Sequence, residues 1–260
     1  MWQALRNELF AAGVEIVTVS LELDGPEASR PFIEAAHAEH PSLLDPTHKL
    51  DALFGVVNIP NVIWIDEDGV IVRPPEPGWP GRTEYPESMR TMLAERARQA
   101  AAASSDSDGT QPAAPNLAAV LQGGQDRRAY PDAIRDWAQH GKQSRYAMTP
   151  DEVIASSQPR GIDESRAAAH FELANHLWRC GNRDAAIRHF KECHRLQPDN
   201  WTYKRQAWSL IGNEQSGGGE LGRFNQVPLP GEESDWPFAS NFSADVAATQ
   251  PGQYYPNTMN

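Results

Sequence analysis

The sequence lacks the features that define several large classes of protein. It has only two cysteines, Cys180 and Cys193, which are too few for a disulfide framework. No apolar stretch approaches the roughly 18 residues that can span a bilayer, so we expect no membrane partner. The N-terminus has no basic leader followed by an apolar block, which predicts a cytoplasmic location.

Basic residues are scarce as well. The 260 residues include 23 Lys and Arg against 35 Asp and Glu, a formal charge of −12, and no long basic run. Binding to a phosphate backbone depends on clustered cations, so we expect no nucleic acid partner. No Ser-His-Asp arrangement, glycine-rich phosphate loop or paired-carboxylate signature stands out, and we therefore assign no catalytic residue and no cofactor.

The histidines do not form a recognisable metal set. His37 and His40 stand three residues apart in a predicted helix, and His189 and His194 lie near each other in the sequence. A tetrahedral site needs further ligands at suitable spacing, and the sequence supplies none. We therefore predict no metal site.

Residues 1–96 alternate between helical and strand patterns, which predicts an α/β fold. The segment 14–23 is rich in β-branched residues and nearly continuous in apolar character, as strands buried on both faces are. It lies between two predicted helices, and a loop with a short helix follows over 42–56. Two short strands around "EDG", where Gly69 can take a positive φ, then predict a hairpin.

The order strand, helix and then "FGVVNIPNVIWIDEDGVIV" resembles the second half of the thioredoxin-like fold, near the redoxin and thiol-disulfide oxidoreductase branches. The resemblance covers roughly residues 1–96. It implies that Pro60 is cis at the opening of a core strand, and that the backbone of Ile59 pairs with an extended substrate peptide. Ile59 and Pro60 are thus the candidate substrate-binding residues. A trans-proline at the first residue of a strand is the alternative explanation.

The resemblance also implies features that this sequence lacks. Members of the family carry Trp-Cys-x-x-Cys at the start of the helix before the strand at 14–20, and the helix N-terminus lowers the pKa of the attacking thiol. The chain has no Cys-x-x-Cys, and the strand that should lie between those at 14–20 and 62–66 is missing too. Either the true start lies upstream of Met1 and includes both thiols, or the domain is an inactive remnant. Cys180 and Cys193 stand 13 apart and are expected to be ordinary buried or half-buried thiols.

The second half of the chain is predicted to be helical. Residues 97–129 have the Ala, Ser and Asp composition of a flexible linker, 130–215 carry helical patterns, and 216–260 look like an irregular tail whose aromatics pack onto a neighbour. Residues 167–200 are identified as a tetratricopeptide-type (TPR) repeat. Its expected packing positions are Leu173, Ala174, Leu177, Gly181, Ala186, Phe190, Cys193 and Leu196.

These observations lead to one hypothesis with one alternative. The hypothesis is that the chain is a truncated thioredoxin-like α/β domain joined to an all-α TPR-like module. The domain would belong to a family of redox and antioxidant proteins but would lack the thiols of that family. The alternative is a non-catalytic scaffold that binds protein partners. In either case the expected partner is a protein or a substrate peptide, and the helical module is either a binding groove or a brace without one.

Overall fold

The computed structural model describes residues 2–80, 129–157, 159–215, 224, 228, 234–250 and 253–256. The N-terminal elements are α1 (Trp2–Leu9), η1 (Phe10–Ala12), β1 (Thr18–Ser20), α2 (Pro26–Ala35), β2 (Ser42–Leu44), α3 (Lys49–Phe54), β3 (Asn61–Ile65) and β4 (Ile71–Pro77). The later elements are α6 (Ala129–His140), η2 (Gly141–Gln143), α7 (Pro150–Ser156), α8 (Ile162–Arg179), α9 (Arg183–Leu196), α10 (Trp201–Gln215) and α11 (Phe242–Ala248). The mixed α/β class is confirmed, and the predicted linker lies outside the described residues apart from Ala129.

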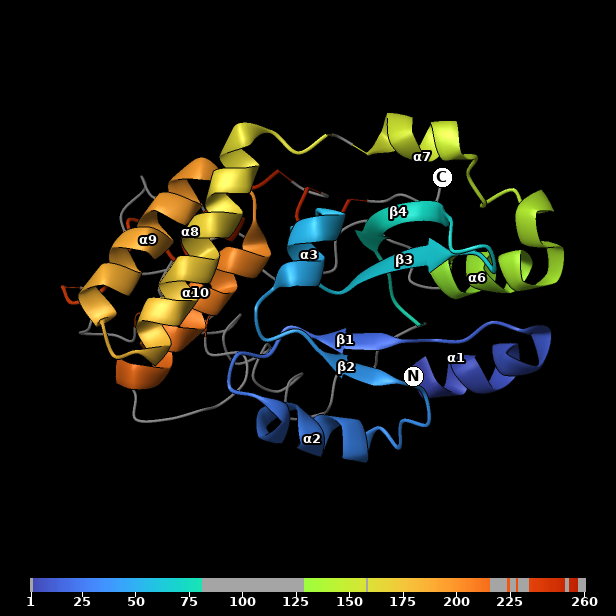
Figure 1. Ribbon diagram of the computed structural model, residues 1–260, viewed down its shortest axis with the longest axis horizontal. Helices are drawn as coiled ribbons and strands as arrows, with labels where there is room; N and C mark the ends of the chain where they lie inside the picture. The colour runs from blue at the N-terminus through green and yellow to red at the C-terminus, as the bar shows by residue number, and fades with distance from the viewer. Residues whose placement is uncertain are drawn as a thin grey trace, which may run out of the picture.

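The strands form two separate two-stranded sheets (Figure 1). β1 and β2 are parallel, with Thr18 opposite Ser42, and the helix α2 connects them. β3 and β4 are antiparallel. Among the described strands, β1 does not pair with β3. Residues 42–44 were expected to be a loop but form the strand β2. A strand of three residues is too short to show an alternating pattern in the sequence.

The strand β1 is shorter and more exposed than its sequence predicts. Its pairing with β2 is confined to three residues, and Val17 and Val19 are 51 % and 38 % exposed. The expectation that this segment is buried on both faces is therefore wrong for the described structure. An apolar run indicates that a strand can be covered, but it does not specify which element covers it.

The predicted hairpin between β3 and β4 is confirmed. Gly69 has φ +78°, and the backbone N–H of Asp66 donates to the carbonyl of Val70 over 2.9 Å. The side chain of Asp66 accepts hydrogen bonds from the N–H groups of Asp68 and Val70, at 3.0 and 2.8 Å. These bonds satisfy the backbone donors of the turn and explain the "DEDG" sequence as turn chemistry.

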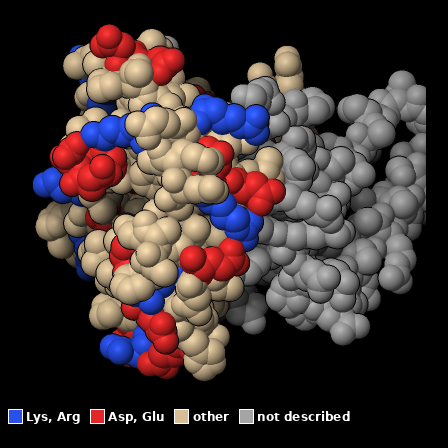
Figure 2. All heavy atoms as spheres, turned by 90° about the vertical axis from the view of Figure 1, so that its right-hand side faces the viewer, with Lys and Arg blue, Asp and Glu red and all other residues tan. Residues whose placement is uncertain are grey.

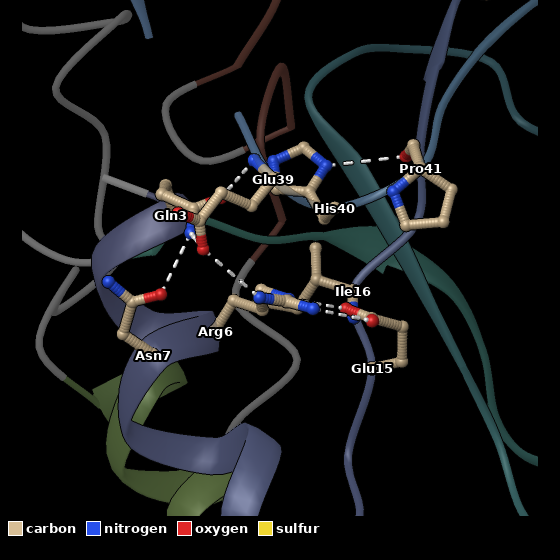
Figure 3. A network of polar contacts seen from close by, with 8 residues as sticks. All are labelled: Gln3, Arg6, Asn7, Glu15, Ile16, Glu39, His40 and Pro41. Atoms are coloured by element: carbon tan, nitrogen blue, oxygen red, sulfur yellow. Dashed lines mark hydrogen bonds and ion pairs between the residues drawn. The ribbon is translucent and has the colours of Figure 1, made fainter. Parts of the chain in front are cut away.

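Polar side chains join α1 to the segments that lead into β1 and β2 (Figure 3). The Arg6 guanidinium donates to both carboxylate oxygens of Glu15, at 2.9 and 3.0 Å, and approaches Glu39 at 3.4 Å. The hydrogen bonds from Arg6 hold the pKa of Glu15 below its usual range. Gln3 accepts from the backbone of Glu39 at 2.7 Å. Two turns of α1 thus fix the entry to both parallel strands.

The helix α6 belongs to the core of the α/β part. Its residues were predicted to belong to the helical module, but α6 packs on α1, β3 and β4 instead. The indole of Trp64 donates to the phenol of Tyr130 over 2.9 Å, and its ring stacks on Trp137 at a centroid distance of 5.1 Å. Tyr130 and Trp64 are almost fully buried. Burial of these large rings accounts for the position of α6, which sequence order alone does not determine.

The helices α8 and α9 form a hairpin, with α10 packed beside it (Figure 1). Gly181, at the turn, has φ +79°. The positions expected to be small or buried are so: Ala174, Ala186, Phe190 and Cys193 have no exposed surface. Leu173 differs from the expectation at 41 % exposure, because each helical residue is turned by about 100° from the one before and Ala174 occupies the inward face.

The C-terminal region is more regular than expected. Residues 242–248 form the helix α11, whose first turn is capped by Asn241, since its side-chain oxygen accepts from the N–H of Ala244 at 3.0 Å. The expected packing of the aromatics is observed, because Phe238 and Tyr254 are buried in the core of the helical module. A short helix with a single capping residue gives little periodic signal in the sequence.

A buried hydrogen-bonded pair lies where α3 meets the helical module. The Nδ1 atom of His48 is 2.8 Å from a carboxylate oxygen of Asp51, and both side chains are 2 % exposed. The His48 ring contacts Phe171 of α8 edge-on, and Phe171 in turn stacks on Tyr203 of α10. Burial raises the pKa of Asp51, and its bond to His48 opposes that effect.

Replacing His48→Ala leaves the Asp51 carboxyl buried without its partner. We expect the free energy of unfolding to fall by about 1–3 kcal/mol, the usual cost of leaving a buried polar group without its hydrogen-bond partner. Urea denaturation followed by tryptophan fluorescence measures this change. His37→Ala is the matched control, because His37 also has a positive φ, 48° against 56°, but is exposed. An equal loss in the two variants would show that the backbone conformation, rather than the bond between His48 and Asp51, is responsible.

Candidate functional site

The candidate residues Ile59 and Pro60 lie in the loop that connects α3 to β3. Pro60 directly precedes β3, and the Ile59–Pro60 bond is cis, as the resemblance implied. Ile59 is 41 % exposed, whereas Asn58 beside it is 5 % exposed. Ile59 is therefore partly accessible to solvent, whereas the side chain of Asn58 is buried and holds the loop in place.

The side chain of Asn58 fixes the loop through three hydrogen bonds. Its oxygen accepts from the backbone N–H of Ile59 at 2.9 Å and from the Nη2 atom of Arg205 at 2.8 Å. Its amide nitrogen donates to the backbone carbonyl of Tyr254 at 2.7 Å. A buried amide with both ends bonded has a defined orientation, so the loop is held in one conformation.

The carbonyl of Ile59 is already in use as an acceptor. The phenol of Tyr255 donates to it over 3.0 Å, and the Nη2 atom of Arg205 lies 3.4 Å away. The resemblance assigns this backbone to an extended substrate peptide. In the described structure, two side chains of the same chain occupy the position.

Aromatic packing holds the two tyrosines in place. Tyr254 is 2 % exposed and contacts Trp201 edge-on at 4.6 Å between ring centroids, while Tyr255 contacts Trp79 edge-on at 5.0 Å. The Nη1 atom of Arg205 donates to the phenol oxygen of Tyr254 over 3.2 Å. Burial raises the pKa of Tyr254 although Arg205 lowers it, so the phenol is neutral at physiological pH.

The N-terminal part of α10 brings Arg205 to this loop. Asn200 caps the helix by accepting from the N–H of Tyr203 at 3.0 Å. A second N–H group in the first turn, that of Thr202, donates to the backbone carbonyl of Val57 at 3.1 Å. The loop thus accepts a hydrogen bond from the backbone of α10, and Arg205 of α10 donates one to the side chain of Asn58 in the loop.

Sequence reasoning missed the residues around Ile59. Arg205 is 146 positions away from Ile59 and Tyr255 is 196 positions away, so no local spacing connects them. The available signals were an arginine within the largely apolar segment "WTYKRQAWSLIG" and the adjacent tyrosines of "QYYP". Neither signal indicates which residues these side chains contact.

Both cysteines lie on the α8–α9 hairpin and both are free. Cys180, which ends α8, is exposed, and its sulfur is 3.7 Å from the Nε2 atom of His176. Cys193 is fully buried, and burial raises the pKa of its thiol far above the usual range. A thiol in such surroundings is a poor nucleophile.

The expectation that His37 and His40 lie on one helix is wrong. α2 ends at Ala35, so His37 and His40 do not share a helix, and His40 is buried with its Nδ1 atom 3.3 Å from the carbonyl of Pro41. His189 lies 2.8 Å from His170, measured between the Nδ1 atoms. Within the described residues, no group of three His, Cys, Asp or Glu side chains is placed to hold a metal ion.

A cavity of about 550 Å³ lies between α9, α10 and the residues before and within α11. His194 lines it, with its ring against Phe238 at 4.8 Å, beside the ion pair of Lys204 and Asp245 at 2.7 Å. Burial, and secondarily the charge of Lys204, lowers the pKa of His194 to about 3, although Asp245 opposes this. The imidazole is therefore neutral in the folded protein.

The His194 environment predicts acid sensitivity. Its folded pKa of about 3 lies below the ordinary value of 6.5, so unfolding takes up a proton between these limits and stability is lost as the pH falls below 6.5. We expect this residue to contribute a loss of about 2 kcal/mol between pH 7 and pH 5. Urea titrations of the unmodified chain and of His194→Gln at both pH values measure the difference. Equal pH dependence in the two proteins would contradict the assignment.

The face made by α1, α6 and α7 carries both signs of charge (Figure 2). Many of these side chains are paired, as in the contacts of Arg135 with Glu8 at 2.8 Å and of Lys142 with Asp68 at 2.6 Å. The described part of this face therefore offers no continuous basic surface.

Comparison of the chain with protein-family models, with curated proteins and with solved structures gives no match. In the described parts of the chain, no helix combines the length and the apolar character needed to cross a bilayer.

Proposed function

We propose that the chain is a thioredoxin-like redox-family protein that holds an extended polypeptide at the backbone of Ile59–Pro60, and that the residues of the printed sequence do not themselves exchange thiols. The observation that carries the proposal is the exposed Ile59, which precedes Pro60 at the entry to β3 and has a carbonyl that acts as a hydrogen-bond acceptor. Backbone acceptors of this kind bind extended peptides regardless of side-chain identity.

The arrangement of the strands supports the same proposal. A parallel pair joined by a helix, followed by an antiparallel hairpin, is the pairing expected on either side of the central strand in a thioredoxin-like sheet. Among the described residues, no strand lies between the two sheets, as the resemblance implies for a chain without its central strand.

The second candidate is a non-catalytic interaction protein. The burial of Cys193 favours it, because the thiol is inaccessible and its raised pKa disfavours the thiolate. The packing of the helical module favours a brace over a binding groove, since Phe171 and Tyr203 lie against His48 of the α/β part.

The first prediction from this proposal concerns chemistry. We expect the purified chain to reduce insulin disulfides no faster than the uncatalysed background with dithiothreitol, because Cys193 is buried and the printed sequence has no Cys-x-x-Cys. Turbidity of the precipitating B chain measures the rate. A rate well above background that persists in a Cys180→Ser/Cys193→Ser double variant would contradict the proposed mechanism, and one lost in that variant would show that these cysteines are catalytic.

The second prediction concerns binding. In a Tyr255→Ala background, which removes the phenol that donates to the Ile59 carbonyl, a photo-crosslinking benzoylphenylalanine placed at Ile59 should capture alkylated insulin B chain with at least a fivefold higher yield than the same group at Leu53. Leu53 is the matched control because it is an exposed apolar residue, 66 % against 41 %, at the end of the neighbouring helix α3. Mass spectrometry of the crosslinked product gives both yields. Equal yields would contradict polypeptide binding at Ile59.

A further inference from the structure

The C-terminal aromatic pair is positioned on the loop as a bound peptide would be. Its two residues use main-chain and side-chain groups in turn: the carbonyl of Tyr254 accepts from Asn58, and the phenol of Tyr255 donates to the carbonyl of Ile59. The rings enter different surroundings, Tyr254 against Trp201 and Tyr255 against Trp79.

The two residues differ in how firmly they are held. Tyr254 is buried in the core of the helical module and is also bonded to Arg205, whereas Tyr255 lies at the surface of that core. Tyr255 contacts Ile59 through a hydrogen bond between partly exposed groups, and its ring packs against Trp79. Such bonds exchange readily with water or with another donor.

A covalently attached segment occupies a site even when its intrinsic affinity is weak. Attachment through a short linker produces an effective concentration on the order of millimolar, so a free polypeptide at micromolar concentration competes poorly. The segment at 253–256 is part of the same chain as the loop and is therefore favoured over any free ligand of similar affinity.

We propose that Tyr254–Tyr255 is an internal ligand that closes the Ile59 site to other polypeptides until it is displaced. The proposal rests on the proposed function in one respect, namely that Ile59 is a polypeptide-binding site. It also defines the chemistry of a competing partner: an extended segment with two adjacent aromatic side chains, of which the second carries a hydroxyl group that donates to Ile59.

The direct test uses the full chain and a synthetic peptide, TQPGQYYPN, with the sequence of residues 249–257. Fluorescence anisotropy of the labelled peptide should show at least tenfold tighter binding to a Tyr254→Ala/Tyr255→Ala variant than to the unmodified chain. The control peptide, in which alanine replaces both tyrosines, should bind neither. Equal affinity of TQPGQYYPN for the two proteins, or no binding to a variant that still unfolds cooperatively, would overturn the proposal.

A second measurement decides the question where the double variant does not fold. Chymotrypsin should cleave between Tyr254 and Tyr255 at least ten times faster in Asn58→Ala than in the unmodified chain, because that variant loses the bond to the Tyr254 carbonyl. Asn7→Ala is the control, since Asn7 is exposed and contacts Gln3 within α1. Equal rates, with unchanged cleavage elsewhere, would show that the loop does not hold the segment.

These outcomes are separate from those of the proposed function. Crosslinking of insulin B chain at Ile59 with no difference in TQPGQYYPN binding would retain the polypeptide site and reject the internal ligand. Specific binding of TQPGQYYPN to the double variant without B-chain crosslinking would retain the internal ligand and reject a general polypeptide site.

Discussion

The guanidinium group of Arg205 joins three segments of the chain that are remote in sequence. It bonds to the side chain of Asn58, approaches the carbonyl of Ile59 and donates to the phenol of Tyr254. A planar group with five fixed donors can serve several acceptors at once, which a lysine ammonium on a flexible stem does less well. The position of α10, the loop before β3 and the C-terminal segment consequently depend on one side chain.

The contacts around Arg205 explain why the helical module and the α/β part meet where they do. Thr202 bonds to Val57 one turn before Arg205, and Tyr203 lies on the ring of Phe171, which in turn contacts His48. Polar and apolar contacts therefore alternate along one face of α10. Alternation of this kind fixes both the distance and the rotation of a helix, because hydrogen bonds are directional whereas apolar packing is not.

The sequence predicted the features that depend on local chemistry. The turn at Gly69, the hairpin turn at Gly181 and the small residues Ala174 and Ala186 each follow from the conformation or the space that the position requires. Features that depend on long-range packing were not predictable in the same way. Nothing near Tyr130 in the sequence indicates that it bonds to Trp64 rather than joining the helices that follow it.

The same distinction applies to the candidate site. Ile59 and Pro60 could be predicted because the resemblance depends on a short stretch of sequence, whereas Asn58, Arg205 and Tyr255 surround them through contacts across most of the chain. An aromatic pair near the C-terminus has no role that can be read from its spacing. It acquires one only when folding brings it to an exposed backbone acceptor. Coupling between the site and global stability follows from this arrangement. The segment that covers Ile59 is anchored by Tyr254, which belongs to the core of the helical module, while Tyr255 is only partly buried. Parts of a protein with few buried contacts open locally at lower free energy than its core does. Release of Tyr255 removes one donor from the Ile59 carbonyl and leaves the Nη2 atom of Arg205 at 3.4 Å, whereas Asn58 is buried and bonds to Tyr254, which lies in the core. Under the proposed function, a competing polypeptide would therefore reach the partly exposed carbonyl of Ile59 before the buried side chain of Asn58.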